Sequence, residues 1–328
     1  MTSRDRRARL KMIIREATNI SRTQRLRFRN CCAEGLGQVF VVTVICCRSG
    51  GDPIPGSGRR RAAAHITGQI CGRADGHPDD TFVMHTHPRA ALSLAVVCPM
   101  ANEGAKAVAF VDAVLAACAG FRRRVFLAVV DHASSDNTRQ LLEEHARFTT
   151  DLKVIWAPEN RGVVDAYVRG YREALALDPD WILEIDAGFS HQPSDIPVLI
   201  AKMEQGYDCV FGSRFCAGGS ISDSSRKRYW ISWGGTVLTN LLLGTKLHDM
   251  TSGFQLFTRE ALQKIVDRGI ESRGPFFQTE MKTYARRMKV TEVPIQYRAA
   301  SHNVGSKQIK DAFKNLWRLV GMRIAGRV

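Results

Sequence analysis

The chain has 328 residues, of which 45% are hydrophobic and 24% are charged, a balance typical of a soluble globular protein. This length allows two domains, or one large α/β domain with an appendage. The apolar run at 39–47 is far shorter than the ~20 residues that span a bilayer, and 38 residues rich in Arg precede it. We therefore expect neither a membrane-spanning helix nor a signal peptide.

The charge is concentrated at one end of the chain. The net charge is +15, and residues 1–90 contain 16 Lys and Arg against 7 Asp and Glu, so more than half of the excess lies there. Arg clusters alternate with Gly, Pro and Asp turns, and only a helix near 5–17 and a strand near 39–45 are indicated. We interpret residues 1–90 as a basic extension of low order. The alternative is an arm for nucleic acid or anionic membranes; because interleaved aromatic residues are missing, we expect no nucleic-acid partner.

The nine cysteines do not form a recognisable framework. Cys31-Cys32 and Cys46-Cys47 are adjacent pairs, there is no C-x-x-C, and Cys98, Cys118 and Cys209 lie within apolar runs, where cysteine behaves as a small hydrophobic residue. We therefore expect free thiols in a reducing cytoplasm rather than disulfides or a zinc site.

From Leu92 onward, strand-like and helical patterns alternate. Strands are indicated at 92–98, 125–131, 153–157, 181–186 and 208–212, with amphipathic helices at 105–119, 136–148, 163–177 and 194–204. This alternation predicts right-handed βαβ crossovers and a doubly wound, mostly parallel α/β sheet. Further elements are predicted in the later part of the chain: a helix at 226–243, a strand at 255–258, a helix at 278–287 and a strand at 289–297.

The last predicted element is a basic amphipathic helix at 306–325, which we separate as residues 305–328 from a domain at 91–304. Its apolar residues recur at helical spacing, while Lys307, Lys310 and Lys314 lie on or beside the opposite face. Two interpretations remain open: a helix docked on the domain, or a helix lying on an anionic membrane surface, which suits Trp317 and the cations.

Polar turns follow three of the predicted strands. Pro99–Glu103, Asp131–Thr138 and Asp186–Pro193 each begin where an apolar run ends. Because the carboxyl ends of parallel strands meet at one edge of an open sheet, these turns predict a ligand crevice there, and their acids suit a nucleotide.

Together with these turns, several further motifs carry a family resemblance: Asn160-Arg161-Gly162, Gly212–Phe215, Asp249–Phe254 and Phe277–Met281. Residues 92–307 resemble a family 2 inverting glycosyltransferase of the GT-A fold, in particular the dolichol-phosphate and polyprenol-phosphate mannosyltransferases. The resemblance implies a GT-A fold and transfer of mannose or a glucose-like sugar from a nucleotide-diphosphate sugar to a polyprenyl or dolichyl phosphate.

The resemblance also implies a set of donor-binding residues. Contacts with the nucleotide sugar are expected from Pro99, Asn102, Glu103, Asp131, Asp136, Arg161, Gly162 and Asp186. For Asp131 and Asp136 the alternative is turn formation and helix capping, which for Asp136 is the main expectation.

A divalent metal would stabilise the leaving diphosphate, but the family's Asp-x-Asp is here Asp186-Ala187-Gly188, so the second carboxylate is missing. Asp186 remains as a ligand, with Ser190 and His191 as further candidates. Whether Mg²⁺ or Mn²⁺ binds stays open. The alternative is that cations such as Arg214, Arg226 and Lys227 replace the metal.

A lipid phosphate acceptor needs cations rather than a general base, since its second pKa near 6 leaves it ionised. Arg226, Arg298 and Lys307 are the candidate acceptor contacts. Asp186, Arg214 and Glu280 are expected to be catalytic; Glu280 would position the acceptor, or act as base for a hydroxyl acceptor.

Competing functions remain. One is transfer to a saccharide hydroxyl in polysaccharide or glycolipid assembly, and another is a catalytically silent nucleotide-sugar binder. A dinucleotide-dependent oxidoreductase is disfavoured, because no G-x-G-x-x-G follows the first strand. For the leading interpretation we expect a peripheral protein on the cytoplasmic face of a membrane.

Overall fold

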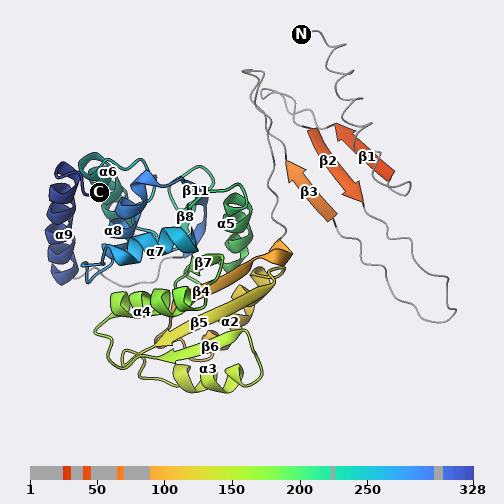
Figure 1. Ribbon diagram of the computed structural model, residues 1–328, viewed down its shortest axis with the longest axis horizontal. Coiled ribbons are helices and arrows are strands. Elements are labelled where there is room, and N and C mark those ends of the chain that lie inside the picture. The colour runs from red at the N-terminus through yellow and green to blue at the C-terminus, as the bar shows by residue number, and fades with distance from the viewer. Residues whose placement is uncertain (1–24, 31–39, 46–64, 70–88, 223–225, 299–305) are drawn as a thin grey trace, which may run out of the picture. The chain divides into compact units, whose positions relative to one another are not determined.

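The computed structural model describes residues 25–30, 40–45, 65–69, 89–222, 226–298 and 306–328 (Figure 1). It divides into two units, Met1–Phe82 and Val83–Val328. Within the first unit, β1 (Arg25–Asn30), β2 (Phe40–Ile45) and β3 (His65–Gln69) form an antiparallel sheet with β2 in the middle. The strand near 39–45 is confirmed as β2, whereas β1 and β3 were not predicted. The helix near 5–17 lies outside the described residues.

The second unit contains a seven-stranded sheet in the order β11-β8-β10-β7-β4-β5-β6. All its neighbouring strands pair in parallel, except that β10 runs antiparallel to both β7 and β8. This arrangement confirms the predicted doubly wound, mostly parallel sheet. The strands are β4 (Ser93–Pro99), β5 (Arg123–Val130), β6 (Leu152–Trp156), β7 (Trp181–Glu184), β8 (Cys209–Ser213), β10 (Gln255–Thr258) and β11 (Val290–Pro294).

Helices cover both faces of this sheet (Figure 1). They are α2 (Lys106–Ala117), α3 (Thr138–Ala146), α4 (Val163–Ala176), α5 (Ile196–Met203), α6 (Arg226–Leu243), α7 (Arg259–Asp267), α8 (Phe277–Tyr284) and α9 (Ser306–Ile324), with short 3₁₀ turns η1 (Arg89–Ala91), η2 (Pro193–Asp195) and η3 (Ala285–Arg287). The predicted helix at 194–204 is thus divided into η2 and α5, and that at 278–287 into α8 and η3.

The continuous apolar run of β4 is explained by burial on both faces. Val96 belongs to one core cluster together with Phe110 of α2, while Val97 belongs to the other together with Tyr171 of α4. Successive side chains of a strand point to opposite faces of the sheet, so the apolar residues of β4 contribute to the hydrophobic cores on both faces.

The strand predicted at 289–297 is two strands. β11 joins the large sheet, and β12 (Gln296–Arg298) pairs in parallel with β9 (Ser220–Ser222) in a separate two-stranded sheet. Pro294 lacks an N–H and ends β11. Ile295, between the two strands, is buried.

The order of the strands reverses beside β4. The chain passes from β4 to β5 and β6 on one side, and then returns to place β7 on the other side of β4. Val97 lies opposite Glu184 in the β4–β7 pair, so the turns that follow both strands leave the sheet at the same edge. Such a reversal is where open α/β sheets bind their ligands. None of the helices in the described residues is both long and apolar enough to cross a membrane.

Candidate active site

The turns after β4 and β5 are joined by Asn102. Its backbone is left-handed, with φ 58°, and its side-chain Nδ2 donates to the carbonyl of Ala133 at 2.8 Å while Oδ1 accepts from the N–H of Ser135 at 2.9 Å. Asn tolerates this conformation better than most residues. The predicted donor-binding residue Asn102 therefore positions one turn against the other.

Asp131 and Asp136 differ in how far their oxygens are engaged. Asp131 is buried at the end of β5, where Oδ1 accepts from the N–H of Ala133 at 2.9 Å and Oδ2 lies 3.4 Å from the amide of Asn160. Asp136 accepts from the N–H of Gly104 at 2.9 Å and of Thr138 at 3.1 Å. Hydrogen bonds led by Thr138 hold the pKa of Asp136 below its ordinary value. These contacts fit the loop-forming interpretation of Asp136.

Asp186 follows β7 directly and is both oriented and open. The hydroxyl of Tyr167 on α4 donates to its Oδ1, and Nδ1 of His191 lies 3.5 Å from its Oδ2, while 42% of the Asp186 side chain remains exposed. His191 is buried between the rings of Phe254 and Tyr297, with both centroids 5.1 Å away. Burial lowers the pKa of His191 to about 4, so a neutral imidazole faces the carboxylate at neutral pH.

The turn after Asp186 brings Gly188 next to the carboxylate of Glu103. Gly188 and Phe189 are both left-handed, with φ 78° and 61°, and the Phe189 ring packs edge-on against Phe110 at 5.1 Å. A Cβ atom at position 188 would lie only 2.7 Å from Oε2 of Glu103. Burial raises the pKa of Glu103, although Lys106 opposes the shift.

The side chains at this edge of the sheet fit a divalent cation that is held partly by the phosphates of a nucleotide. The described residues contain no ready-made cluster of three or more His, Cys, Asp or Glu side chains. Mg²⁺ sites that bind phosphates need only one or two protein carboxylates, since phosphate oxygens and water complete the coordination. Asp186 satisfies this requirement.

Ser190, a further predicted metal ligand, lies in the turn after β7. Its backbone carbonyl accepts a hydrogen bond from the N–H of Arg298 at 2.9 Å.

Arg214 forms a buried ion pair. Its Nε lies 2.7 Å from Oδ2 of Asp249 and its Nη2 2.9 Å from Oδ1, and the Tyr297 ring lies 5.2 Å from its guanidinium carbon. Burial would raise the pKa of Asp249, but Arg214 holds it well below its usual range. The positive charge of Arg214 is therefore largely compensated, which favours a positioning role at the end of β8.

Glu280 is tied to the C-terminal helix. Its buried carboxylate accepts from five donors: the N–H groups of Glu271 and Ser272, the hydroxyls of Ser272 and Tyr284, and the guanidinium of Arg318 on α9. Burial raises its pKa, but these hydrogen bonds and Arg318 outweigh that effect and lower it. The bonding favours a role in anchoring α9 rather than proton transfer.

Further buried polar side chains lie behind the crevice and were not predicted as site residues. The carboxylate of Glu184 accepts from Tyr171 at 2.6 Å, from Gln255 at 3.1 Å and from Gln278, and burial raises its pKa to about 8. Lys282 donates to the carbonyls of Asp249 at 2.7 Å and Ser252 at 3.0 Å. In the sequence, the pair of tyrosines at helical spacing in α4 was the available signal.

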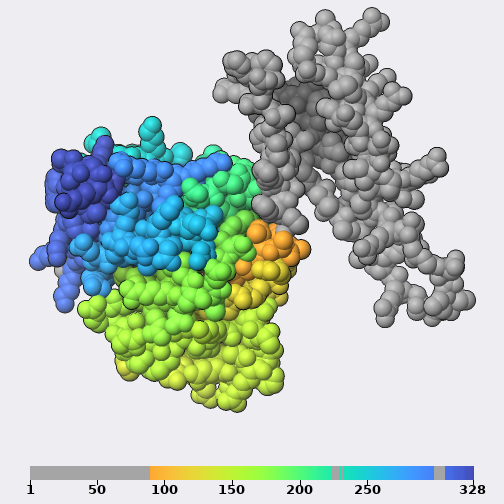
Figure 2. Space-filling view, in the orientation of Figure 1, coloured from red at the N-terminus to blue at the C-terminus, as the bar shows by residue number. Residues whose placement is uncertain are grey.

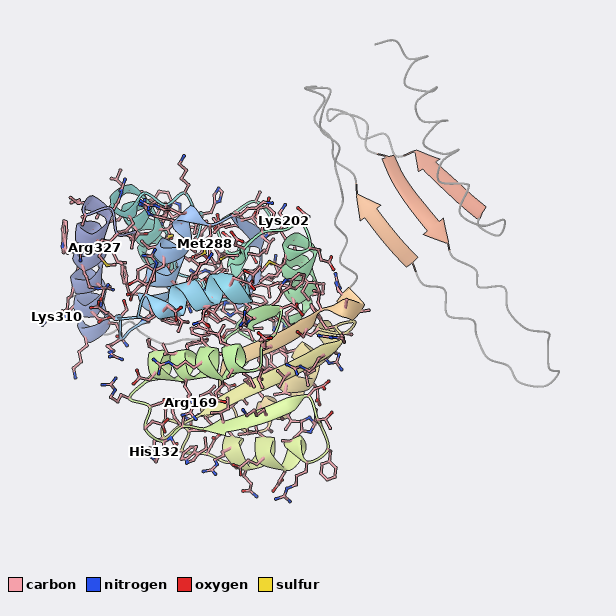
Figure 3. All side chains as sticks on the ribbon, viewed as in Figure 1. His132, Arg169, Lys202, Met288, Lys310 and Arg327 are labelled. Atoms are coloured by element: carbon pink, nitrogen blue, oxygen red, sulfur yellow. The ribbon has the colours of Figure 1, made fainter. Side chains whose placement is uncertain are left out.

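The remaining predicted residues lie around the rim. Arg161 is exposed and pairs with Asp165 at 2.9 Å, next to Gly162, where α4 begins. Arg298 and Lys307 are exposed on β12 and α9. Pro99 ends β4. The side chain of Arg226 lies outside the described residues. His132, which lies near the carboxyl ends of β5 and β6 (Figure 3), contacts the Trp156 ring at 5.3 Å.

Comparisons with known proteins identify relatives in sequence and in fold. An undecaprenyl-phosphate mannosyltransferase from Micrococcus luteus is 33% identical over 171 residues, 52% of this chain and 70% of that protein. A polyprenol monophosphomannose synthase from Mycolicibacterium smegmatis is 28% identical over 236 residues, 71% of this chain and 88% of that protein. Crystal structures of glucosyl-3-phosphoglycerate synthase from Mycobacterium tuberculosis share the fold, with a TM-score of 0.52 and 18% identity over 71% of this chain and 82% of that one.

The family described as Glycosyl transferase family 2 matches residues 95–266, more than half of the chain. This match extends from β4 to α7 and includes the turns after β4, β5 and β7 that make up the candidate site. The chain therefore belongs to glycosyl transferase family 2, and it is a glycosyltransferase.

Proposed function

We propose that this glycosyltransferase moves mannose or a glucose-like sugar from a nucleotide-diphosphate sugar to a polyprenyl phosphate, with inversion, at the cytoplasmic face of a membrane. The names of the two relatives support a lipid phosphate acceptor. The observation that carries the proposal is an apolar surface on α6 and α9, because a lipid acceptor requires access to a membrane.

This apolar surface is unusual within the described residues. Ten of their 13 exposed large hydrophobic side chains lie on these two helices: Tyr229, Trp230, Trp233, Val237, Leu238 and Leu241 on α6, and Ile309, Phe313, Trp317 and Ile324 on α9. The two helices lie together at one end of the second unit (Figure 2). Exposed apolar patches of this kind mark protein or membrane contacts.

Cations accompany the apolar surface. Lys307, Lys310 and Lys314 are exposed on α9, and Lys310 extends outward from the helix (Figure 3). Trp and Lys at the edge of an apolar face are typical of helices that lie on anionic membranes. Near the C-terminal end of α9, the Arg323 guanidinium donates to the carbonyl of Leu242 on α6 at 2.7 Å, which holds the two helices together.

A chain of polar contacts connects α9 to the crevice. Asp311 on α9 accepts from the N–H of Gly274 at 3.1 Å, and neighbouring Arg273 pairs with Asp165 near the start of α4 at 2.8 Å. Tyr167, two residues farther along α4, contacts Asp186. A lipid held at α9 would therefore be linked through α4 to the carboxylate of Asp186.

In the proposed reaction, an oxygen of the lipid phosphate attacks the anomeric carbon, and the nucleoside diphosphate leaves from the opposite side. Pro99 and Asp131 would contact the nucleoside, and Arg226, Arg298 and Lys307 the acceptor phosphate. The acceptor is already ionised, so no residue needs to remove a proton. A divalent cation at Asp186 would neutralise charge that develops on the leaving diphosphate, as Mn²⁺ and UDP-glucose occur together in the structural relative.

The test is transfer of radiolabelled sugar from a panel of GDP- and UDP-sugars to a short polyprenyl phosphate, with the unphosphorylated polyprenol as matched acceptor. We expect a lipid-linked product from one donor with the phosphate and none with the alcohol, and loss of product with EDTA. Transfer to a saccharide hydroxyl instead, or nucleotide-sugar binding without any turnover, would contradict the proposal.

A further inference from the structure

We propose that Glu103 supplies the second carboxylate of the cation site at Asp186, in place of the acid that is missing at position 188. This inference depends on the proposed function, since it concerns how the donor's diphosphate is held. It differs from the sequence-based assignment of Glu103 to the nucleoside, and it explains why the Asp-x-Asp pattern can be incomplete.

The first argument is the contact between Glu103 and Gly188. A Cβ atom at position 188 would lie 2.7 Å from Oε2 and 3.2 Å from Oε1 of Glu103, too close unless the Glu103 side chain moved. The carboxylate of Glu103 therefore occupies the space that a side chain at 188 would need. A side chain at position 188 would require the Glu103 carboxylate to move from the place that it occupies.

The second argument is how firmly Glu103 is placed. Its N–H donates to Oγ1 of Thr138 at 2.8 Å, and the next N–H, of Gly104, donates to the same oxygen at 2.9 Å and to Asp136 at 2.9 Å. The backbone on both sides of the Glu103 side chain is thus fixed by the turn after β5. Within the described residues, the Glu103 carboxylate itself has no hydrogen bond or ion pair, although it is half-buried.

The third argument comes from His191 on the other side of Asp186. Its buried Nδ1 has no hydrogen-bond partner among the described residues and lies 3.5 Å from Oδ2 of Asp186. Leaving a buried polar atom unpaired has a cost. An unpartnered nitrogen and a partly open carboxylate oxygen that face each other are the arrangement expected beside a cation or its water.

The two carboxylates also suit the ion's needs. Tyr167 bonds to Oδ1 of Asp186, which leaves Oδ2 for a cation. Glu103 then supplies the second carboxylate. Two carboxylates with phosphate oxygens and water are a common way of holding Mg²⁺ or Mn²⁺ against a nucleotide. The structure therefore points to a cation held between the turns after β4 and β7.

The experiment measures Mn²⁺ affinity directly, by electron paramagnetic resonance of free Mn²⁺ in the presence of UDP or GDP, in the wild type, Glu103→Gln and Asp186→Asn. The matched control is Glu144→Gln, on the outer side of α3. We expect Glu103→Gln and Asp186→Asn each to weaken Mn²⁺ binding by about tenfold or more, with Glu144→Gln unchanged. Binding of the nucleoside without metal, followed by calorimetry, should be unaffected by Glu103→Gln.

A swapped variant sharpens the test. Glu103→Ala combined with Gly188→Asp moves the acid to position 188, where the left-handed backbone strains any side chain, so it should recover only part of the Mn²⁺ affinity that Glu103→Ala loses. Unchanged Mn²⁺ affinity in Glu103→Gln, or a loss confined to metal-free nucleoside binding, would overturn the inference. So would a wild-type protein that binds no Mn²⁺ with either nucleotide. Failure of lipid transfer alone, with these affinities as expected, would count only against the proposed acceptor.

Discussion

The candidate donor site and the buried polar layer, formed by Arg214, Asp249, Glu280 and Lys282, use the same residue types in opposite ways. In the candidate site, Asp186 and Glu103 keep carboxylate oxygens available, and Asp186 is 42% exposed. In the buried layer, Arg214 and Asp249 compensate each other, and Glu280 is surrounded by donors. A charged group that binds a ligand needs oxygens or nitrogens without a partner in the protein. A buried charged group that stabilises the fold needs hydrogen-bond or ion-pair partners. Whether a charged side chain has a partner therefore distinguishes candidate ligand-binding residues from structural ones better than its residue type does.

The largest effect should come from the crevice. Asp186→Ala removes the carboxylate that follows β7, and we expect transfer to fall by about 10³-fold or more, since a group that stabilises the transition state is lost. The fold should persist, because the side chain is partly exposed. The measurement is the initial rate of transfer together with the thermal midpoint; Asp112→Ala, on α2, is the control. Full activity in Asp186→Ala would place the donor site elsewhere.

In the buried layer the expected loss is stability. Glu280→Gln removes the charge facing Arg318 and turns an acceptor into a donor, so unfolding should become easier by about 3–5 kcal/mol. Glu271→Gln is a matched control, because Glu271 pairs with the same Arg318 at 3.3 Å but is 65% exposed; it should cost less than about 1 kcal/mol. Urea unfolding measures both. A stable Glu280→Gln with abolished transfer would instead assign Glu280 to catalysis.

A pH dependence should appear in the same layer. Burial lowers the pKa of Lys282 to about 8 from its ordinary 10.5, although Asp249 opposes the shift. Between these values the unfolded chain binds more protons than the folded one, so this group makes stability rise with pH, by at most roughly 3 kcal/mol. The stability that neutral Lys282 contributes is fully present above the pKa of the unfolded chain, 10.5. It is lost as the pH falls toward the pKa of the folded protein, about 8. Lys282→Met should flatten this rise in urea unfolding curves, whereas exposed Lys264→Met should not.

The smallest effect concerns the apolar surface on α6 and α9. Trp230→Ala combined with Trp317→Ala removes two large exposed rings and should weaken binding to vesicles containing anionic phospholipid by about tenfold. Transfer to a detergent-dispersed short acceptor should change little. Phe148→Ala, at an even more exposed site outside these helices, is the control in vesicle flotation. Equal flotation of all three proteins would remove the membrane assignment of this surface.

Much of the second unit followed from the sequence. The apolar run of β4 and the amphipathic pattern of α4 predicted their elements, whereas the ligand site indicated by the acids after β5 and β7 stays a prediction. Errors arose where one pattern serves two structures, as with the strand at 289–297, which Pro294 divides between two sheets. Strand β1 does alternate, with Leu26 and Phe28 between arginines, but its Arg-rich surroundings led us to expect low order there, and β3 has only five residues.

The sequence by itself determined the strand–helix alternation, the family motifs and the missing acid at position 188, because these are properties of neighbouring residues. Only the tertiary structure decided which charges are compensated. Arg214 meets Asp249 across 35 residues, Glu280 meets Arg318 across 38, and Glu103 reaches Gly188 from a different strand. Pairing depends on distances of a few ångströms between segments far apart in the chain, and no local pattern of residues encodes them.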